Sequence, residues 1–220
     1  MDAAERASSL DAVAAEAAEC VRCPLAEGRT HVVFGEGNPD ADLVLVGEAP
    51  GFHEDRDGVP FAGRAGELLA RLLAAVGLSL GDTYRATVLK CRPPGNRDQL
   101  PAETSACEPY LYRQLELIQP TVVATLGSFA TALLSGRALG ITRVHGEEQQ
   151  VTLGGRAVTL LPLYHPAAAL YTPTMLAVLE RDVARLPDLL GETPLPVPLV
   201  VEPVRVEALA GARPVQLGLF

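Results

Sequence analysis

Apolar positions follow two alternating patterns over the first 186 residues. Short, continuous apolar runs that end at Gly, Pro or polar residues predict buried strands. They cover residues 41–47, 83–89, 121–127 and 155–164. Between and around them, apolar residues recur at helical spacing and predict helices. These cover residues 2–19, 63–78, 101–120, 128–136 and 174–186. Strands that alternate with helices and are apolar throughout indicate a three-layer α/β/α domain with a mostly parallel four-stranded sheet.

Sites in sheets of this kind lie beyond the carboxyl ends of the strands. The segments that follow the four predicted strands are "GEAPG" (47–51), "LKCRPP" (89–94), "LGS" (126–128) and "YHPAA" (164–168). Because parallel strands end at the same edge, these four segments are expected to converge on one site.

The residue pattern of the chain changes after Leu186. Prolines interrupt any helical or strand period at positions 187, 194, 196, 198, 203 and 214. A chain of 220 residues with 48% hydrophobic residues can bury one core and still carry an extension. We therefore expect a domain over residues 1–186 and a Pro-rich tail over residues 187–220, extended and disordered at least to residue 214. The alternative is a segment that packs on the domain through its valines and leucines.

Composition narrows the cellular setting. No apolar run is long enough to span a membrane. The first 20 residues are acidic and alanine-rich and do not resemble a signal peptide, so we expect a cytoplasmic protein. In that reducing compartment, four cysteines are better explained as ligands or free thiols than as disulfides. A net charge of -9 argues weakly against a nucleic-acid partner, because phosphates attract Lys and Arg.

The four cysteines are the strongest chemical signal. They are Cys20, Cys23, Cys91 and Cys107, in the pattern C-x2-C followed at a distance by C-x15-C. Four thiolates suit a structural zinc ion or an iron–sulfur cluster, and the spacing alone leaves the metal open. Cys91 opens a proline-rich loop that a bound metal could order. Four unrelated buried thiols, or a redox pair at Cys20 and Cys23, are the alternatives, although no thioredoxin-like strand precedes that pair.

Several motifs together resemble one family. They are "CVRCPL", "RTHVVFGEGNPDADLVLVGEAPG", "GVPFAGRAGELL", "LKCRPPGNR" and "YHPAA". In this order they are similar to the family 4 uracil-DNA glycosylases, the iron–sulfur members of that superfamily, from about Cys20 to Leu186. The resemblance implies a monofunctional enzyme of bacterial DNA repair that hydrolyses the N-glycosidic bond of uracil and leaves an abasic site. It also implies a structural [4Fe–4S] cluster on the four cysteines, no nucleotide cofactor, and a monomer associated with the nucleoid.

The resemblance assigns the chemistry to a few residues. Breaking the glycosidic bond develops positive charge on the sugar and negative charge on uracil O2. Glu48 would orient water or stabilise the sugar cation, with Glu54 assisting. His165 would donate a hydrogen bond to O2, and Phe61 would stack on the flipped base. Each has a structural alternative: a solvated loop acid, a lone core histidine or a core phenylalanine.

The resemblance also implies binding residues. Those around the base are Gly47, Ala49, Pro50, Gly51, Phe61 and Thr87, and those toward DNA are Arg92, Arg97, Pro166, Leu170 and Tyr171. Thr87 stands where the family commonly has Asn, whose amide both donates and accepts. A single hydroxyl does one or the other well, so relaxed or altered base choice is an alternative. Tyr171 and Ala168 also depart from the family pattern, but an aromatic residue at 171 is a credible wedge.

Two further features concern partners. Basic residues are expected to form a DNA-binding face on this acidic protein: Arg56, Arg64, Arg85, Lys90, Arg92 and Arg97. The final "QLGLF" resembles the pentapeptide that binds the bacterial sliding clamp, with contacts from Gln216, Leu217, Leu219 and Phe220. A non-catalytic iron–sulfur DNA-binding module, in which Thr87 marks a decayed pocket, is the alternative function.

Overall fold

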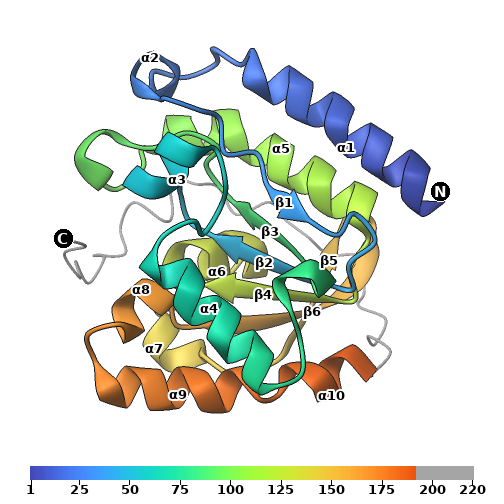
Figure 1. Ribbon diagram of the computed structural model, residues 1–220, viewed down its shortest axis with the longest axis vertical. Coiled ribbons are helices and arrows are strands. Elements are labelled where there is room, and N and C mark those ends of the chain that lie inside the picture. The colour runs from blue at the N-terminus through green and yellow to red at the C-terminus, as the bar shows by residue number, and fades with distance from the viewer. Residues whose placement is uncertain (192–220) are drawn as a thin grey trace.

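A six-stranded sheet organises the protein (Figure 1). The structure is a computed structural model and describes residues 1–191. Four parallel strands form the centre in the order β3 (Thr83–Thr87), β2 (Leu43–Gly47), β4 (Val122–Leu126) and β6 (Arg156–Leu163). Two antiparallel strands complete the edges: β1 (Glu36–Gly37) beside β3, and β5 (Gln149–Leu153) beside β6. The chain leaves β2 toward β3 and later returns to β4 on the other side, which creates the switch point where α/β sheets place ligands.

The three-layer architecture and the four parallel strands are confirmed, but the sheet has six strands rather than the predicted four. Both missed strands are at the edges. β1 has two residues, too few for a periodic signal. β5 reads "QQVTL" and is only half-buried, so it lacks the continuous apolar run of a central strand.

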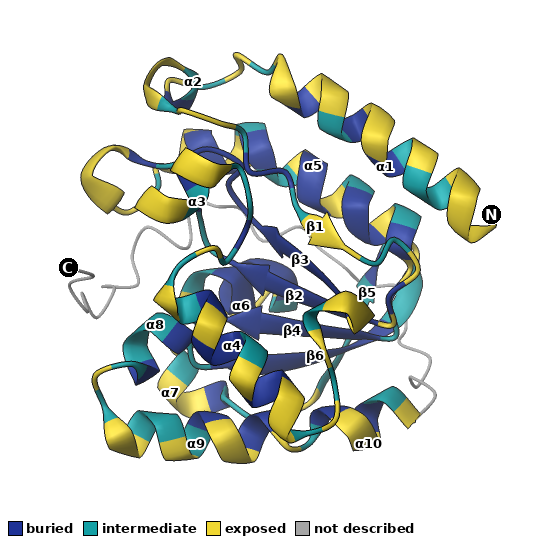
Figure 2. Cartoon of the chain, viewed as in Figure 1, coloured by how far each residue is buried: buried dark blue, intermediate teal, exposed yellow. Residues whose placement is uncertain are grey.

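Helices cover both faces of the sheet (Figures 1 and 2). On one face lie α1 (Ala3–Ala18), α5 (Pro101–Ile118) and α6 (Ser128–Ser135). On the other lie α4 (Arg64–Ala75), α9 (Pro173–Val183) and α10 (Leu186–Gly191). Four short helices complete the set: α2 (Leu25–Gly28), α3 (Phe52–Asp57), α7 (Ile141–Val144) and α8 (Pro166–Ala169).

Successive side chains of β2 point to opposite faces of the sheet, which explains why helices pack on both faces. Leu43 and Leu45 pack with α4, whereas Val44 and Val46 pack with α5 on the opposite side. All four side chains are almost fully buried. Since full burial of such a side chain contributes roughly 1.5–3 kcal/mol, the strand is held from both layers.

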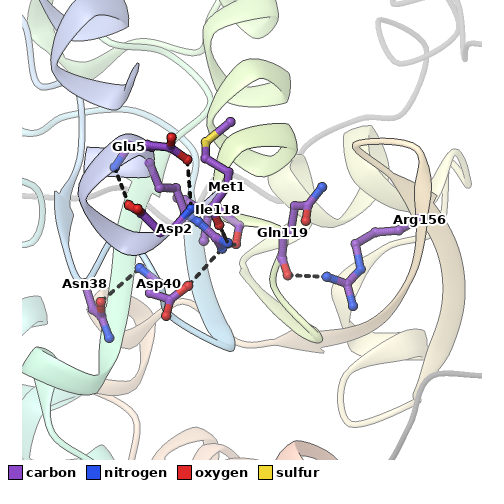
Figure 3. A network of polar contacts seen from close by, with 9 residues as sticks. Met1, Asp2, Glu5, Asn38, Asp40, Ile118, Gln119 and Arg156 are labelled. Atoms are coloured by element: carbon purple, nitrogen blue, oxygen red, sulfur yellow. Dashed lines mark hydrogen bonds and ion pairs between the residues drawn. The ribbon is translucent and has the colours of Figure 1, made fainter. Parts of the chain in front are cut away.

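Polar contacts fix the outer helix α1 to the rest of the domain (Figure 3). Asp2 and Glu5 form a capping box at its start. Arg6 then donates to the carbonyl of Ile118 at 2.6 Å and pairs with Asp40 at 3.0 Å. The helix that leads into the segment with Cys20 and Cys23 is therefore anchored at its N-terminus.

The domain extends beyond the expected boundary at residue 186. Pro187 stands in the first turn of α10, where a missing backbone N–H costs little. Leu186 and Leu189 of this helix are buried in the core. Residues 187–191 thus belong to the folded domain and not to an extended tail. The remainder of the predicted tail, including the peptide at 216–220, lies outside the described residues. Over residues 1–191, no helix is both long and apolar enough to cross a membrane.

Candidate active site and cysteine cavity

The carboxyl edge of the sheet brings together segments that are far apart in sequence. Gly47, the last residue of β2, is paired in register with Thr87, the last residue of β3. Gly127, after β4, donates its N–H to the carbonyl of Leu163 at 2.9 Å, and His165 follows two residues later. A Cβ on Gly127 would lie 3.5 Å from the Cβ of His165. These segments therefore converge at the carboxyl edge of the sheet, as predicted. Helices α3 and α8 lie at the same end of the sheet (Figure 1).

Phe61 occupies the centre of this edge. Its ring lies close over Gly47, where a Cβ would come within 3.0 Å of Phe61 Cζ and 3.4 Å of Thr87 Cγ2. The backbone at Phe61 has φ of 58°, a left-handed conformation that is rare for a bulky side chain. Gly66 allows it, because a Cβ there would lie 1.7 Å from the Phe61 carbonyl oxygen. The start of α4 thus presses directly on this strained residue and fixes its ring.

His165 is held as a neutral hydrogen-bond donor. Its ring stacks beside that of Phe61, with centroids 6.3 Å apart and an interplanar angle of 26°. Burial lowers the pKa of His165 to about 4, against the opposing charge of Glu54, so the ring is uncharged at neutral pH. Nδ1 accepts from the N–H of Ala167 at 3.2 Å. The ring proton must therefore reside on Nε2, which leaves that N–H available to a ligand.

Glu48 directly follows β2 and is half-buried. Burial, followed by the nearby charge of Asp98, raises the pKa of Glu48 to about 7. A carboxyl group with this pKa can both hold and release a proton near neutral pH. Asp98 comes from the loop after Cys91, so this loop also contributes to the electrostatics of the site.

Glu54 has a supporting position. Its carboxylate accepts from the N–H of Gly51 at 3.1 Å and from the N–H of Gly63 at 3.3 Å. It thereby ties the loop after β2 to the loop before α4. The neighbouring Asp55 is buried and accepts from the N–H and hydroxyl of Thr30, both at 2.9 Å. These bonds indicate that the acid pair of α3 positions the loops around Phe61.

The hydrogen bonds of Thr87 decide which of the two roles its hydroxyl can play toward a base. It is buried, and its hydroxyl donates to the carbonyl of Leu89 at 2.6 Å. Its own carbonyl accepts from Lys90 Nζ at 2.7 Å, and the same ammonium group donates to Gln114. A hydroxyl that already donates can offer only its lone pairs to a ligand.

Most of the basic residues predicted to face DNA are instead buried or paired with an acid. Lys90 is 1% exposed, and burial lowers its pKa to about 7. Arg85 is buried and pairs with Glu36 at 2.7 Å. Arg97 forms a bidentate pair with the buried Glu103, so its charge is compensated. Arg56 pairs with Asp57 on the surface. Of the six basic residues predicted for this face, Arg64 and Arg92 are the two without an acidic partner among residues 1–191.

The segment after His165 presents one exposed aromatic. Tyr171 is 68% exposed, and its hydroxyl accepts from Arg64 at 3.2 Å. Leu170, the other predicted wedge residue, is half-buried against the core on the α4 side. Pro166 is buried as the first residue of α8. Of the two predicted wedge residues, Tyr171 is therefore the exposed one. On the other side of the site, Pro50 is buried and Ala49 is half-buried.

All four cysteines line one small cavity, together with Arg22, Arg29, Lys90 and Tyr110. Three N–H groups donate to their sulfurs: Arg22 to Cys20 at 3.5 Å, Arg29 to Cys91 at 3.5 Å, and the backbone of Lys90 to Cys107 at 3.1 Å. Burial raises the pKa of the Cys107 thiol to about 11. Ionisation of this thiol therefore calls for a cation in the cavity, and the two arginines favour the resulting negative charge.

A zinc ion and an iron–sulfur cluster set different requirements on the spacing of the four sulfurs. A tetrahedral zinc ion with Zn–S bonds of about 2.3 Å requires sulfurs roughly 3.8 Å apart. In the described part of the chain, no group of three or more His, Cys, Asp or Glu side chains is arranged to hold a single ion. The four thiols around one cavity are nevertheless the set of soft ligands that a cluster would use.

Comparison with known proteins agrees with this geometry. The family model described as the Uracil DNA glycosylase superfamily matches residues 34–187. The type-4 uracil-DNA glycosylase of Archaeoglobus fulgidus is 43% identical over 188 residues, which cover 84% of this chain and 94% of that protein. This chain belongs to the type-4 uracil-DNA glycosylase family. The corresponding protein of Thermotoga maritima is 43% identical over 74% of this chain and 83% of its own length. The type-5 uracil-DNA glycosylase of Thermus thermophilus is 35% identical over 46% of this chain and 53% of its own.

Sequence reasoning missed several residues that build this type-4 site. Asp98 acts on Glu48 through space, and Asp55 joins α3 to Thr30. Arg29 donates to the carbonyl of Cys20 at 2.6 Å and to the sulfur of Cys91. Arg29 had a usable signal, because it opens the "RTHVVF" motif directly after the cysteine turn. Asp98 had none, since its partner is 50 residues upstream.

Proposed function

We propose that this protein removes uracil from DNA by hydrolysing the N-glycosidic bond and leaves an abasic site. The observation that carries the proposal is the combination, at one sheet edge, of a neutral histidine with a free Nε2–H and a carboxyl group whose pKa is about 7. Phe61 stacks beside His165 and lies over Gly47, the residue before Glu48, and offers an aromatic wall. The names of the relatives support the same activity.

The reaction divides between these side chains. The bond from the sugar C1′ to uracil N1 breaks, and its electron pair passes into the uracil ring, mostly to O2. His165 Nε2–H donates a hydrogen bond to that developing anion, and the neutral imidazole keeps its proton while it does so. Glu48, as the carboxylate, orients the attacking water and accepts its proton as oxygen bonds to C1′. Phe61 stacks on the flipped base during these steps.

The cofactor proposed here is a [4Fe–4S] cluster on Cys20, Cys23, Cys91 and Cys107. Its role is structural: bound by thiolates, it links the segment after α1, the end of β3 and the start of α5. Arg29 and Thr30 continue from that segment to Asp55 in α3, which supports the site. Purified protein should be brown, absorb near 400 nm and contain about four iron atoms per chain. Zinc in place of iron would overturn this assignment.

Base preference is the part of the function that Thr87 leaves open. Because its hydroxyl donates to Leu89, it can accept from uracil N3–H but cannot donate to O4. Thr87 therefore makes fewer contacts with uracil than an amide would, and it discriminates less between uracil and other bases. Relaxed base choice is the second candidate function. A Thr87→Asn variant should increase the preference for uracil over the other bases.

The test is cleavage of labelled oligonucleotides followed by alkali treatment. The panel carries U opposite G, U opposite A, single-stranded U, T opposite G, and hypoxanthine. Breaks at uracil that disappear in His165→Ala are expected, and breaks at several bases support the relaxed alternative. Intact DNA binding without breaks would favour the non-catalytic module instead.

The clamp contact through Gln216, Leu217, Leu219 and Phe220 remains a prediction, as do the monomeric state and the nucleoid location. That peptide lies outside the described residues. A pull-down with a bacterial sliding clamp should recover the wild-type chain and lose Phe220→Ala. Equal recovery of both would overturn this part of the proposal.

A further inference from the structure

Phe52 is an exposed aromatic residue that the proposed chemistry does not use. It follows Gly51 as the first residue of α3, and it is 56% exposed. Its contacts with two neighbouring side chains hold the ring in place. The ring of His53 meets it edge-on, with centroids 5.5 Å apart.

Arg92 supplies a positive charge beside this ring. The guanidinium carbon lies 5.3 Å from the Phe52 centroid. Arg92 Nε donates to Asn96 at 2.8 Å, which orients the guanidinium group. Within residues 1–191, Arg92 has no acidic partner, in contrast to Arg97 in the same loop. An exposed ring at the start of α3 and an uncompensated cation from the loop after β3 thus form one patch.

The patch has a fixed position relative to the proposed active site. Gly51 is held through its N–H by Glu54, and the same carboxylate holds Gly63. The next residue, Arg64, bonds to the exposed Tyr171. The proposed base-binding loop is therefore continuous with Phe52 on one side and linked to the Arg64–Tyr171 pair on the other.

We infer that Phe52 and Arg92 form a stacking subsite for an unpaired base of the DNA strand that carries the target uracil. The ring would cover the face of a neighbouring base while the guanidinium group pairs with a phosphate of the same strand. Stacking of this kind requires a base whose face is open, as in single-stranded DNA, and tolerates any base identity. The inference deepens the proposed function, on which it rests, by naming the strand form that the enzyme would prefer.

The absence of tryptophan from the sequence permits a direct test. Phe52→Trp introduces a single fluorescent indole at the patch and preserves a stacking surface. We expect uracil-free single-stranded oligonucleotides to quench its fluorescence, and a matched duplex to quench it much less. The control is Tyr112→Trp, at an exposed position on α5, which should not respond to DNA.

Binding measurements complete the test. Phe52→Ala should weaken binding of the same uracil-free single strand by about 5- to 100-fold, the usual range for one stacked base. Arg92→Ala should weaken it and reduce the salt dependence by about one ion. Tyr112→Ala should bind like the wild type. Because uracil-free DNA is used, these results are independent of whether the protein excises uracil. Fluorescence of Phe52→Trp that is unchanged at saturating DNA, or equal quenching by duplex, would overturn the inference.

Discussion

Replacing Glu48 by Gln should stabilise the protein at alkaline pH while it removes activity. Glu48 is half-buried, and burial together with Asp98 raises its pKa from 4.5 to about 7. A carboxyl group whose pKa is raised on folding contributes stability below its unfolded pKa, and this contribution is lost as pH rises through about 7. Above that pH, the folded protein must hold a poorly solvated carboxylate. Gln has no such cost.

The magnitude follows from the shift. A rise of about 2.5 pKa units at ~1.4 kcal/mol per unit gives an upper figure of about 3.5 kcal/mol at high pH. Partial exposure of the side chain reduces it, so we expect the advantage of the variant to grow by about 2 kcal/mol between pH 5 and pH 8.5. For a domain of this size, that corresponds to a rise of roughly 4–8 °C in the difference between the two melting temperatures.

The assay is thermal unfolding of wild type and Glu48→Gln across that pH range. Glu180→Gln, at an exposed position on α9, serves as the control and should show no pH-dependent difference. Excision by Glu48→Gln should fall by about 10²- to 10⁴-fold. A stability difference that is independent of pH would refute the assigned ionisation of Glu48.

Three further variants probe how the site is held. Gly66→Ala places a methyl group 1.7 Å from the Phe61 carbonyl oxygen and should lower the rate of excision more than 10-fold. Gly28→Ala, which has open space around it, should not lower the rate. Equal rates of the two variants would contradict the role of Gly66 in holding Phe61. Asp98→Asn removes an acid that raises the pKa of Glu48, so the rising limb of kcat/KM should move toward lower pH, and an unmoved limb would contradict that coupling. Cys107→Ser should lose the absorbance near 400 nm and most of the bound iron, while Ser105→Ala on the same helix keeps both; retained iron would remove Cys107 from the ligand set.

Local patterns predicted the centre of the fold well. β2 and β4 are nearly continuous apolar runs that end at Gly, and all residues of β2, β3 and β4 are buried, so this pattern depends on burial from both sides. Edge strands carry a weaker signal, because β5 is half-buried and β1 is too short. The turn of helix after Leu186 was also missed, since Pro187 reads as a break unless the partners of Leu189 are known.

Charged residues were the least predictable part of the site. A sequence shows that Arg85, Lys90 and Arg97 are basic, but not that Glu36, Gln114 and Glu103 meet them in space. These pairings turn three expected DNA contacts into internal bonds. The same limit concealed Asp98, whose effect on Glu48 depends on a loop that folds back over the sheet.

The most direct test of the proposed function is detection of the released base without alkali. A single-stranded oligonucleotide with one uracil would be incubated with the protein, and free uracil and the abasic strand would be quantified by mass spectrometry. We predict equal amounts of both products, with no strand cleavage and at least a 100-fold slower release by His165→Ala. DNA that is bound but yields no free uracil would contradict the account.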